Sequence, residues 1–488
     1  MFLVDHLILL VGALLLIGIV SSKLSARLGL PVLVLFLGVG MLAGEDGPGR
    51  IQFDNIPLAH AIGTLALAVI LFDGGLQTKR RALASAWKPS VLLATVGVLT
   101  TAAITGVASA YLLGVPLLTG LLLGSIVAST DAAAVFAVLR SQGLRLRERV
   151  AATLEVESGS NDPMAIFLTI ALVEVLNGQS SLGIDVLQLF VLQMGVGAVA
   201  GLAVGWLAVA TINRMNLATA GLYPVLTSSF ALLAFGTAAV FGGSGFLAIY
   251  LAGIVIGNSR TVFQRGTFLF LDGLAWIGQI SMFVLLGLLS TPSQVLDVAG
   301  QGLLVATVLT FVARPLSVVP ILLPFGFSVR ETLLIAWVGL KGAVPIILAM
   351  YPLLFGLAEG AVLFNVVFFV VLVSATLQGW TLPPIARRLG LQEPPRPEPP
   401  ATLEITALRD VSADIVEYVV AEGSRAAGGK VRDLGLPDDA VLAMISRGPM
   451  LIPPRGSTEI AVGDHVFVVL RADARAAVDA VFGRAVGA

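Results

Sequence analysis

The chain has 488 residues, of which 57% are hydrophobic and 12% are charged, and its formal net charge is −1. Soluble domains carry about 25% charged residues, so this composition predicts an integral membrane protein, and the charge gives no reason to expect a nucleic-acid partner. The absence of cysteine excludes disulfides, thiol catalysis and Cys-ligated metals. The three histidines are too widely spaced to suggest a histidine metal centre, and no cofactor is predicted.

Thirteen apolar segments follow one another along the chain, and segments of about 20 such residues are typical of spanning helices. The first lacks a preceding basic region, so we interpret it as a retained helix rather than a signal peptide. We expect an all-α polytopic membrane domain whose helices cover residues 2–20, 30–44, 58–76, 89–112, 116–139, 150–173, 186–211, 222–241, 244–258, 267–289, 298–323, 331–351 and 359–384.

The charges of the connecting loops support this number. Cytoplasmic loops are rich in Lys and Arg, and here basic loops alternate with acidic or neutral ones along the whole chain. The first loop carries Lys23 and Arg27, for example, whereas the second carries Glu45, Asp46 and Asp54 with a single arginine. A missed or invented helix would invert the alternation, so we predict thirteen helices with the N-terminus outside and the C-terminus in the cytoplasm.

Polar interruptions occupy corresponding segments of the two halves of the chain. An odd number of helices with a lone middle one suits two inverted repeats of six, and broken helices in matching places mark the midplane site of a secondary transporter. The fifth segment contains Ser129-Thr130-Asp131, and the twelfth contains Gly339-Leu340-Lys341-Gly342-Ala343-Val344-Pro345. We expect two crossed broken helices, the alternative being an ordinary kinked pair with a snorkelling Lys341.

The sixth segment carries the strongest candidate for a transport site, Asp162. A carboxylate at the bilayer centre costs about 2.5–3.5 kcal/mol on insertion scales. Burial disfavours the charged form and a nearby cation favours it, so we predict that Asp162 binds either a proton or a monovalent cation. Asn161 would supply an uncharged oxygen, and Ser158, four residues before Asp162, shares its helix face. The alternative for Asp162 is a structural acid with a basic partner.

Two further acids need partners of their own. Glu157 lies five residues before Asp162 and therefore points elsewhere, so we predict a buried structural ion pair between Glu157 and Arg314, the alternative being a snorkelling arginine. Asp131 lies at the helix break, where its carboxylate and the freed carbonyl of Thr130 suit a hard cation such as sodium or potassium.

The remaining charged candidates lie at the second break and near a helix end. Lys341 would neutralise half-helix carbonyl ends at its own break, the second one. Asp73 lies near the cytoplasmic end of the third segment. It is either an interfacial acid or a lining residue of the cytoplasmic access path to the cation site.

The composition changes after Arg388. Residues 389–400 are rich in proline and predict a stiff linker. Residues 401–488 predict a small cytoplasmic α/β domain with strands at 403–408, 441–446 and 465–470 and a closing helix at 473–481. The domain has no G-x-G-x-x-G, so no dinucleotide-binding half is visible.

Together these motifs resemble the cation:proton antiporters of the sodium/proton exchanger superfamily, and among them the bacterial NhaP-type potassium/proton antiporters. The resemblance covers residues 1–388 and depends on Phe72-Asp73-Gly74-Gly75-Leu76, Ser129-Thr130-Asp131, Glu157 to Pro163, Arg314-Pro315 and Gly339 to Ala343. The tail is similar to TrkA-C (RCK-C) regulatory domains through Gly429-Lys430, Leu434-Gly435-Leu436-Pro437, Ser446-Arg447-Gly448 and Gly463-Asp464.

The resemblance implies a homodimer in the lipid of a bacterial plasma membrane, with a core domain that rocks against a dimerisation domain. It implies electroneutral one-for-one exchange through the Asn161-Asp162 pair. It also implies a cation site formed by Asp162, Ser158, Asp131, Thr130 and Asp73, with Glu157 and Arg314 as a buried ion pair. The chain departs from relatives at Lys341, where many have Arg, and at Ala132, where many have Pro.

The sequence therefore predicts a secondary antiporter that exchanges potassium or sodium for protons and is not an enzyme. A ligand-gated cation channel is the alternative, although the four-fold filter signature of channels is absent. An intramembrane enzyme would need a nucleophile–base pair or a metal set, and the missing Cys and sparse His argue against it. The ligand of residues 401–488 stays open between a nucleotide, a cation and none, and similar tails suggest a cyclic dinucleotide.

Overall fold

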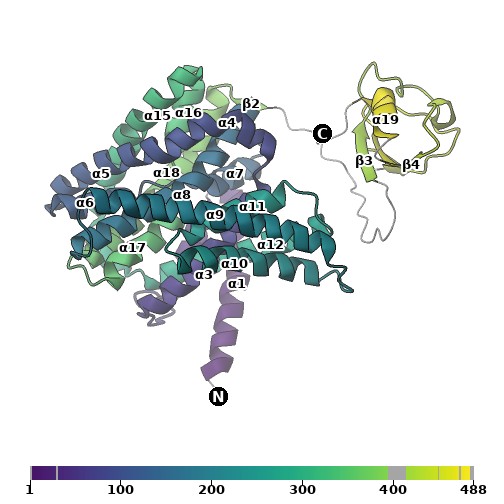
Figure 1. The fold of residues 1–488 in the computed structure, drawn as a ribbon. Helices are drawn as coiled ribbons and strands as arrows, with labels where there is room; N and C mark the ends of the chain where they lie inside the picture. The colour runs from purple at the N-terminus through teal and green to yellow at the C-terminus, as the bar shows by residue number, and fades with distance from the viewer. Residues whose placement is uncertain (1–2, 29–30, 394–413, 449, 472–473, 484–488) are drawn as a thin grey trace. The chain divides into compact units, whose positions relative to one another are not determined.

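The computed structural model describes residues 3–28, 31–393, 414–448, 450–471 and 474–483. Its contacts divide the chain into two compact units, residues 1–395 and 396–488 (Figure 1). We describe each unit by itself.

The first unit is almost entirely helical (Figure 1). π-helical turns at Leu93–Gly97 and Leu309–Ala313 join α4 to α5 and α14 to α15 without a break. The helices are α1 (Leu3–Leu28), α2 (Val32–Ala43), α3 (Ile56–Gln77), α4 (Arg80–Leu92), α5 (Val98–Leu113), α6 (Leu117–Ile126), α7 (Ala132–Ser141), α8 (Glu148–Leu176), α9 (Ile184–Arg214), α10 (Leu222–Val240), α11 (Gly245–Gly257), α12 (Gln264–Leu289), α13 (Pro292–Asp297), α14 (Ala299–Val308), α15 (Arg314–Leu322), α16 (Val329–Trp337), α17 (Val344–Leu354) and α18 (Gly360–Arg388).

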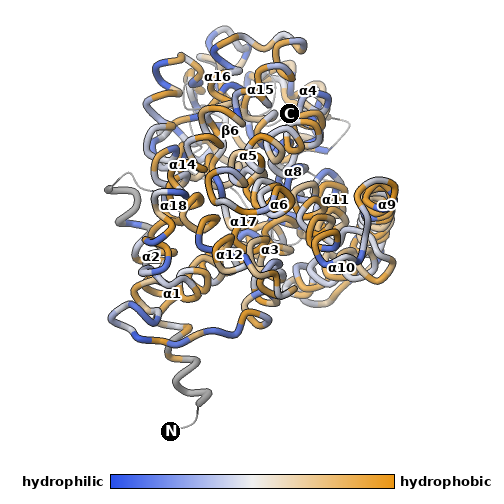
Figure 2. The backbone as a smooth tube through the Cα atoms, turned by 90° about the vertical axis from the view of Figure 1, so that its left-hand side faces the viewer, coloured by the Kyte–Doolittle hydropathy of each residue, from blue (hydrophilic) through white to orange (hydrophobic). Residues whose placement is uncertain are grey.

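The lengths and hydropathy of these helices agree with a membrane protein. Within the described part of the chain, eight helices are long and apolar enough to cross a membrane, and further apolar helices are shorter. Apolar residues run along the helices, and the polar ones gather mainly in the connections (Figure 2). The predicted class, a mostly helical membrane protein with a small C-terminal domain, is therefore confirmed.

Two of the expected helices are each divided into two short ones. The segment expected at 116–139 forms α6 and α7, and the segment expected at 331–351 forms α16 and α17. Asp131 is the N-cap of α7, and its carboxylate accepts a hydrogen bond from the backbone of Ala134. Pro345, within the first turn of α17, suits a helix start because the N–H that proline lacks has no helical partner there.

The long helices pack in two groups. One contains α2, α3 and α9–α12, and the other contains α4–α8 and α14–α18. Lipid is as apolar as the helix surfaces, so helices in a membrane associate through close packing of their backbones, which small residues permit. At the α3–α11 contact a Cβ on Gly75 would lie 3.1 Å from the Cα of Gly253. Glycine is therefore needed at both positions.

A short antiparallel ribbon joins distant parts of this unit. β1 (Arg145–Leu146), between α7 and α8, pairs with β2 (Gln392–Glu393), after α18. Leu391, just before β2, is 1% exposed and belongs to the same buried hydrophobic cluster as Leu146 of β1. The sequence predicted that residues 389–393 belong to the linker. They are instead part of the helical unit, because residues 392–393 pair with β1. The rest of the expected linker, 394–400, lies outside the described residues.

The second unit contains a four-stranded antiparallel sheet and one helix, α19 (Arg475–Phe482) (Figure 1). The order is β3-β6-β4-β5, with β3 at Asp414–Val419, β4 at Ala440–Arg447, β5 at Met450–Ile452 and β6 at His465–Leu470. Tyr418 of β3 packs against Phe482 of α19 with ring centroids 5.4 Å apart.

The expected strands at 441–446 and 465–470 and the closing helix are present. The expected strand at 403–408 lies outside the described residues. β3 and β5 were not predicted. β5 is only three residues long, which is too short for a strand pattern to be read.

Candidate functional site

The two interrupted helices meet at their breaks. α6 ends at Ile126 and α16 ends at Trp337, and each is followed by a short non-helical stretch before the next helix begins. The backbone N–H of Asp131 in the first break donates to the carbonyl of Leu340 in the second at 2.8 Å. The crossing of two broken helices, expected from the sequence, is therefore present in the fold.

Charged side chains lie at the helix ends that the breaks expose. Asp131 caps the N-terminus of α7 through the backbone of Ala134 at 3.0 Å. The ammonium of Lys341 donates to the carbonyls of Ser129 at 2.8 Å and Ala128 at 3.4 Å, just beyond the C-terminus of α6. The negative charge of Asp131 thus faces the partly positive N-terminus of α7, and the positive charge of Lys341 faces the partly negative C-terminus of α6.

The partner of Lys341 differs from the one that the sequence predicts. Lys341 was expected to neutralise carbonyl ends at its own break, the second one, but its ammonium lies at the first. The second break lies against the carbonyl end of α6, so the carbonyls within reach of the ammonium are those of the first break. The backbone N–H of Lys341 in turn donates to Ser374 of α18 at 3.2 Å.

α8 places two polar side chains, Ser158 and Asn161, against the first break. The hydroxyl of Ser158 donates to the carbonyl of Thr130 at 2.9 Å and accepts from the backbone of Ala132 at 3.0 Å. The amide of Asn161 donates to the Thr130 hydroxyl at 2.7 Å. The Asn161 Oδ1 atom is enclosed and has no hydrogen-bond partner among the described residues. An uncharged oxygen is therefore free beside Asp162.

Asp162 lies one turn beyond Ser158 on α8 and is 7% exposed. Asp162, Ser158 and Asp131 all line one cavity of about 570 Å³ between the two helix groups. This cavity extends to Gln77 at the end of α3 and to Ser141 at the end of α7. The arrangement places a buried carboxylate at the floor of a cavity, with a second carboxylate and polar oxygens beside it, and suits a monovalent cation or a proton.

Asp73 lies on α3 further along the same cavity, and the amide of Gln77 donates to its carboxylate at 2.5 Å. The structure therefore brings Asp73 into the cavity of Asp162 and Asp131 rather than leaving it at an unrelated surface. Thr130 contacts the site through its carbonyl and hydroxyl but does not line the cavity.

Sequence reasoning missed other lining residues. Glu155 lies seven residues before Asp162, so helical periodicity could have placed it on the same face of α8. Tyr250 of α11 and Asp272 of α12 also line the cavity. Asp272 is the one acid in the apolar segment expected at 267–289, and an acid in such a segment is a signal that could have marked it. No signal in the sequence marks Tyr250.

Glu157 and Arg314 lie away from the cavity. Arg314 Nη1 is 2.6 Å from Glu157 Oε1, and the two side chains are almost completely buried. Arg314 also donates to the carbonyl of Val338, in the second break, at 3.5 Å. The pair therefore ties α8 to the segment that follows α16, and it was expected from the sequence as a structural pair.

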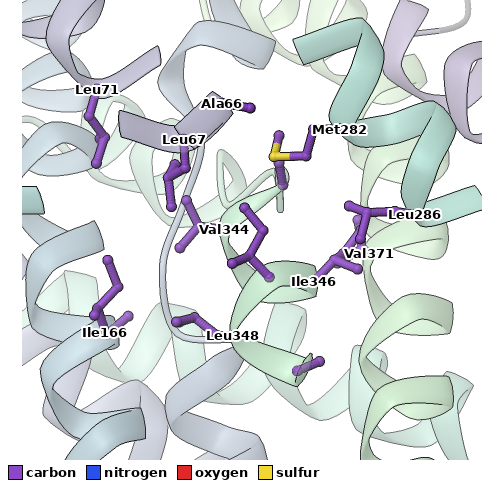
Figure 3. Close-up of a cluster of buried hydrophobic side chains, with 14 of the residues drawn as sticks. Ala66, Leu67, Leu71, Ile166, Met282, Leu286, Val344, Ile346, Leu348 and Val371 are labelled. Carbon is purple, nitrogen blue, oxygen red and sulfur yellow. The ribbon is translucent and has the colours of Figure 1, made fainter. Parts of the chain in front are cut away.

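Apolar side chains pack between α3, α8 and α17. Figure 3 shows Leu67 and Leu71 of α3, Ile166 of α8, and Val344 and Leu348 of α17 in this packing. All five belong to the largest buried hydrophobic cluster. Their buried side chains fill the space between these three helices.

Gly159 gives a test of how closely the two helix groups approach at the site. A Cβ on Gly159 would overlap the ring and hydroxyl of Tyr250 on α11. We expect Gly159→Ala to lower the maximal exchange rate by about tenfold, because small misplacements at a site have large effects on rate. The measurement is cation-dependent proton release in membrane vesicles.

The double variant Gly159→Ala/Tyr250→Ala is the matched control for that prediction. It removes the ring that the new methyl group would meet, so it should recover most of the rate lost by the single variant. Equal rates for wild type and Gly159→Ala would show that this contact does not constrain the site.

Comparison with known proteins adds independent findings. The sodium/hydrogen exchanger, transmembrane family matches residues 11–388, and the TrkA-C domain matches residues 415–483. The chain is 44% identical over 464 residues to a protein named K(+)/H(+) antiporter NhaP2 from Shewanella sp. strain ANA-3, covering 94% of this chain and 80% of that protein. It is 42% identical over 465 residues to the K(+)/H(+) antiporter NhaP of Alkalimonas amylolytica, covering 95% and 81%.

A solved structure has the same fold. The sodium proton antiporter MjNhaP1 of Methanocaldococcus jannaschii, determined at pH 8, matches with a TM-score of 0.69 and 25% sequence identity, covering 79% of this chain and 99% of that one. The relatives are antiporters, so the chain is a transporter rather than an enzyme. With three quarters of its length matched by the family and a TrkA-C domain behind it, the chain belongs to the sodium/hydrogen exchanger family.

Proposed function

We propose that the chain is an electroneutral antiporter that exchanges potassium, sodium or both for protons across a bacterial plasma membrane. One observation carries the proposal: Asp162 is buried at the floor of a cavity, beside the crossing of two broken helices. Relatives named as potassium/proton and sodium/proton antiporters support both cations.

Competition at Asp162 couples the two fluxes. Asp162 carries either a proton or a cation, and the site changes sides only when one of them is bound. Ser158, Asn161, Thr130 and Asp131 surround it with oxygen atoms, which are the ligands that hard cations prefer.

Three charged groups at the breaks already have fixed partners. Lys341 is held by the carbonyls of Ala128 and Ser129, Arg314 by Glu157, and Asp131 by the N-terminus of α7. A single carboxylate that changes its occupant gives one proton per monovalent cation. This supports electroneutral one-for-one exchange.

The membrane topology follows from the same proposal. Thirteen spanning helices in two inverted repeats of six agree with the paired breaks at 127–131 and 338–343 and with the alternating loop charges. In this topology the N-terminus is outside and the C-terminus is cytoplasmic. The cavity of Asp162 then opens to the cytoplasm, because the basic loops after α3 and α7 lie at its mouth.

Two other functions are less well supported. A ligand-gated channel needs a continuous path, whereas buried apolar side chains fill the space between α3, α8 and α17. The relatives at 42% and 44% identity are named antiporters, not channels. An enzyme is not supported, because the relatives are named as transporters.

The function is tested in everted vesicles with an imposed proton gradient. Addition of potassium or sodium should release the gradient in vesicles that contain the protein and not in vesicles without it. Valinomycin-clamped vesicles should give the same rate at zero membrane potential and at an imposed one, as electroneutral exchange requires. No response to any monovalent cation would exclude the proposed antiport.

The tail is proposed to regulate this exchange in a homodimer. Residues 401–488 contain a sheet with its own buried core and match a domain type named for potassium-transport regulators. Its ligand is a nucleotide, a cyclic dinucleotide, a cation or none, and nucleic acid is not expected as a partner. The domains we propose are 1–388 for transport and 401–488 for regulation, and the linker, expected at 389–400, begins only after the strand residues 392–393.

Removal of the tail should change regulation and not the exchange chemistry. We expect a variant that ends at residue 400 to exchange the same cations, because the residues around Asp162 lie in the helical unit. The dependence of its rate on pH or on cytoplasmic nucleotides should be altered. The measurement is the proton response to each cation across pH with and without residues 401–488. Identical profiles would contradict a regulatory role.

A further inference from the structure

A second cavity lies at the other end of α3 from Asp73. Its volume is about 370 Å³, and it is lined by Ile56 at the start of α3, by Met350 and Leu353 of α17 and by Asn365 of α18. The first cavity reaches Leu71 and Asp73 near the end of the same helix. α3 therefore runs from one cavity to the other.

One face of α3 is continuous between the two cavities. Ile56, His60, Thr64, Leu67 and Leu71 follow at intervals of four, four, three and four residues, which places them on one face of a helix. Ile56 lines the second cavity and Leu71 lines the first. His60 and Thr64 are the polar residues of this face.

α17 is packed against this face. The rings of His60 and Tyr351 meet edge to face with centroids 4.9 Å apart. A Cβ built on Gly63 would lie 3.3 Å from Cγ1 of Ile347. α17 is one of the four half-helices that flank the two breaks, and it follows the break that contains Lys341.

The polar atoms on this face have no partners. His60 Nε2 and Thr64 Oγ1 are enclosed and make no hydrogen bond with any described residue. Several threonines in other helices have a partner: the hydroxyls of Thr95, Thr169 and Thr227 each donate to the carbonyl four residues earlier. Thr105 and Thr332 share the unpaired state of Thr64, but neither lies on a helix face that joins two cavities. A buried polar atom without a partner is unfavourable and needs an explanation.

We propose that this face of α3 is the outer half of the ion path, and that His60 Nε2 and Thr64 Oγ1 contact the hydrated monovalent cation when α17 withdraws from α3. In the present state the path is closed between Thr64 and Leu71. Figure 3 shows Leu67 of α3 close to Val344 of α17 there. The second cavity is then the outer vestibule. This inference rests on the proposed transport function.

Thiol labelling tests the path directly, because the chain has no cysteine and a single introduced thiol is unique. Thr64→Cys and His60→Cys are treated in right-side-out vesicles with a membrane-impermeant, positively charged thiosulfonate. The control is Leu65→Cys on the neighbouring face of α3, where Leu65 is 56% exposed on the surface of the unit. A thiolate forms in water and not in lipid, so we expect the two path thiols to react about tenfold faster than the control.

Exchange is measured in the same vesicles, and wild-type exchange tests the proposed function separately from the path. The reagent should block exchange by Thr64→Cys or His60→Cys and leave Leu65→Cys unaffected. If both path thiols react no faster than Leu65→Cys in vesicles that exchange cations, the proposed outer path is wrong.

A pair of substitutions at Thr64 separates the hydroxyl from the packing. Thr64→Val keeps the shape and removes the hydroxyl, whereas Thr64→Ser keeps the hydroxyl and removes the methyl group. We expect Thr64→Val to lower the maximal exchange rate several-fold and Thr64→Ser to stay near wild type, with similar amounts of protein in the membrane. The reverse order would assign Thr64 a packing role and overturn the proposal.

Discussion

Asp162→Asn should abolish cation-dependent proton release. Asparagine has nearly the same shape as aspartate but carries no charge and accepts no proton in the physiological range. Because Asp162 lies at the floor of the cavity, its carboxylate is the group for which the cation and the proton compete. We expect the rate in everted vesicles to fall to the level of vesicles without the protein, for potassium and for sodium alike.

The structure supplies a matched control for this substitution. Asp185→Asn changes a partly exposed acid on α9 that lies outside the cavity and accepts hydrogen bonds from Ser181, so its exchange should be unchanged. The Asp162→Asn protein should also be at least as heat-stable as wild type, because the variant removes a buried acid. Exchange by Asp162→Asn at the wild-type rate would overturn the site assignment.

Glu157→Gln should destabilise the protein strongly. Glu157 and Arg314 form a buried ion pair with 2.6 Å between Oε1 and Nη1. Removal of one partner of such a pair typically costs about 3–5 kcal/mol, because the other charge stays buried without compensation. Arg314 also contacts the second break through Val338. We therefore expect a lower melting temperature in detergent and a large loss of exchange together.

Two comparisons separate this effect from a general sensitivity of α8. Glu148→Gln changes the same residue type at the exposed start of α8 and should leave the melting temperature unchanged. The double variant Glu157→Gln/Arg314→Met removes both charges, so its loss of stability should be smaller than the sum of the two single losses. A stable and fully active Glu157→Gln protein would show that the pair has no structural role.

The outcomes at Glu157 and Asp162 distinguish two kinds of buried acid in one helix. Glu157 has a fixed cation as partner and does not line the cavity, whereas Asp162 lines the cavity and has no fixed cation in contact among the described residues. Loss of the first charge should act through stability. Loss of the second should act through exchange alone. Measuring both the melting temperature and the exchange rate in vesicles for each variant distinguishes these two roles.

Helical periodicity alone is sufficient to separate these two acids. Five residues along a helix turn a side chain away from its starting face, and four bring it back. This spacing places Ser158 with Asp162 and directs Glu157 elsewhere. The same periodicity also places Glu155, seven residues before Asp162, on the helix face of Asp162.

The sequence by itself determined the membrane class, the approximate positions of most helices and the positions of both breaks, although α1 continues to Leu28 and α4 begins at Arg80, beyond the expected bounds. These properties depend on hydropathy and periodicity, which can be read from each short segment by itself. Only the tertiary structure decided which segments meet. Lys341 lies at the carbonyls of Ala128 and Ser129, more than two hundred residues earlier in the chain. Tyr250 and Asp272 join the cavity of Asp162, and residues 392–393 pair with residues 145–146. Such contacts depend on the packing of distant helices, and no local pattern in the chain encodes them.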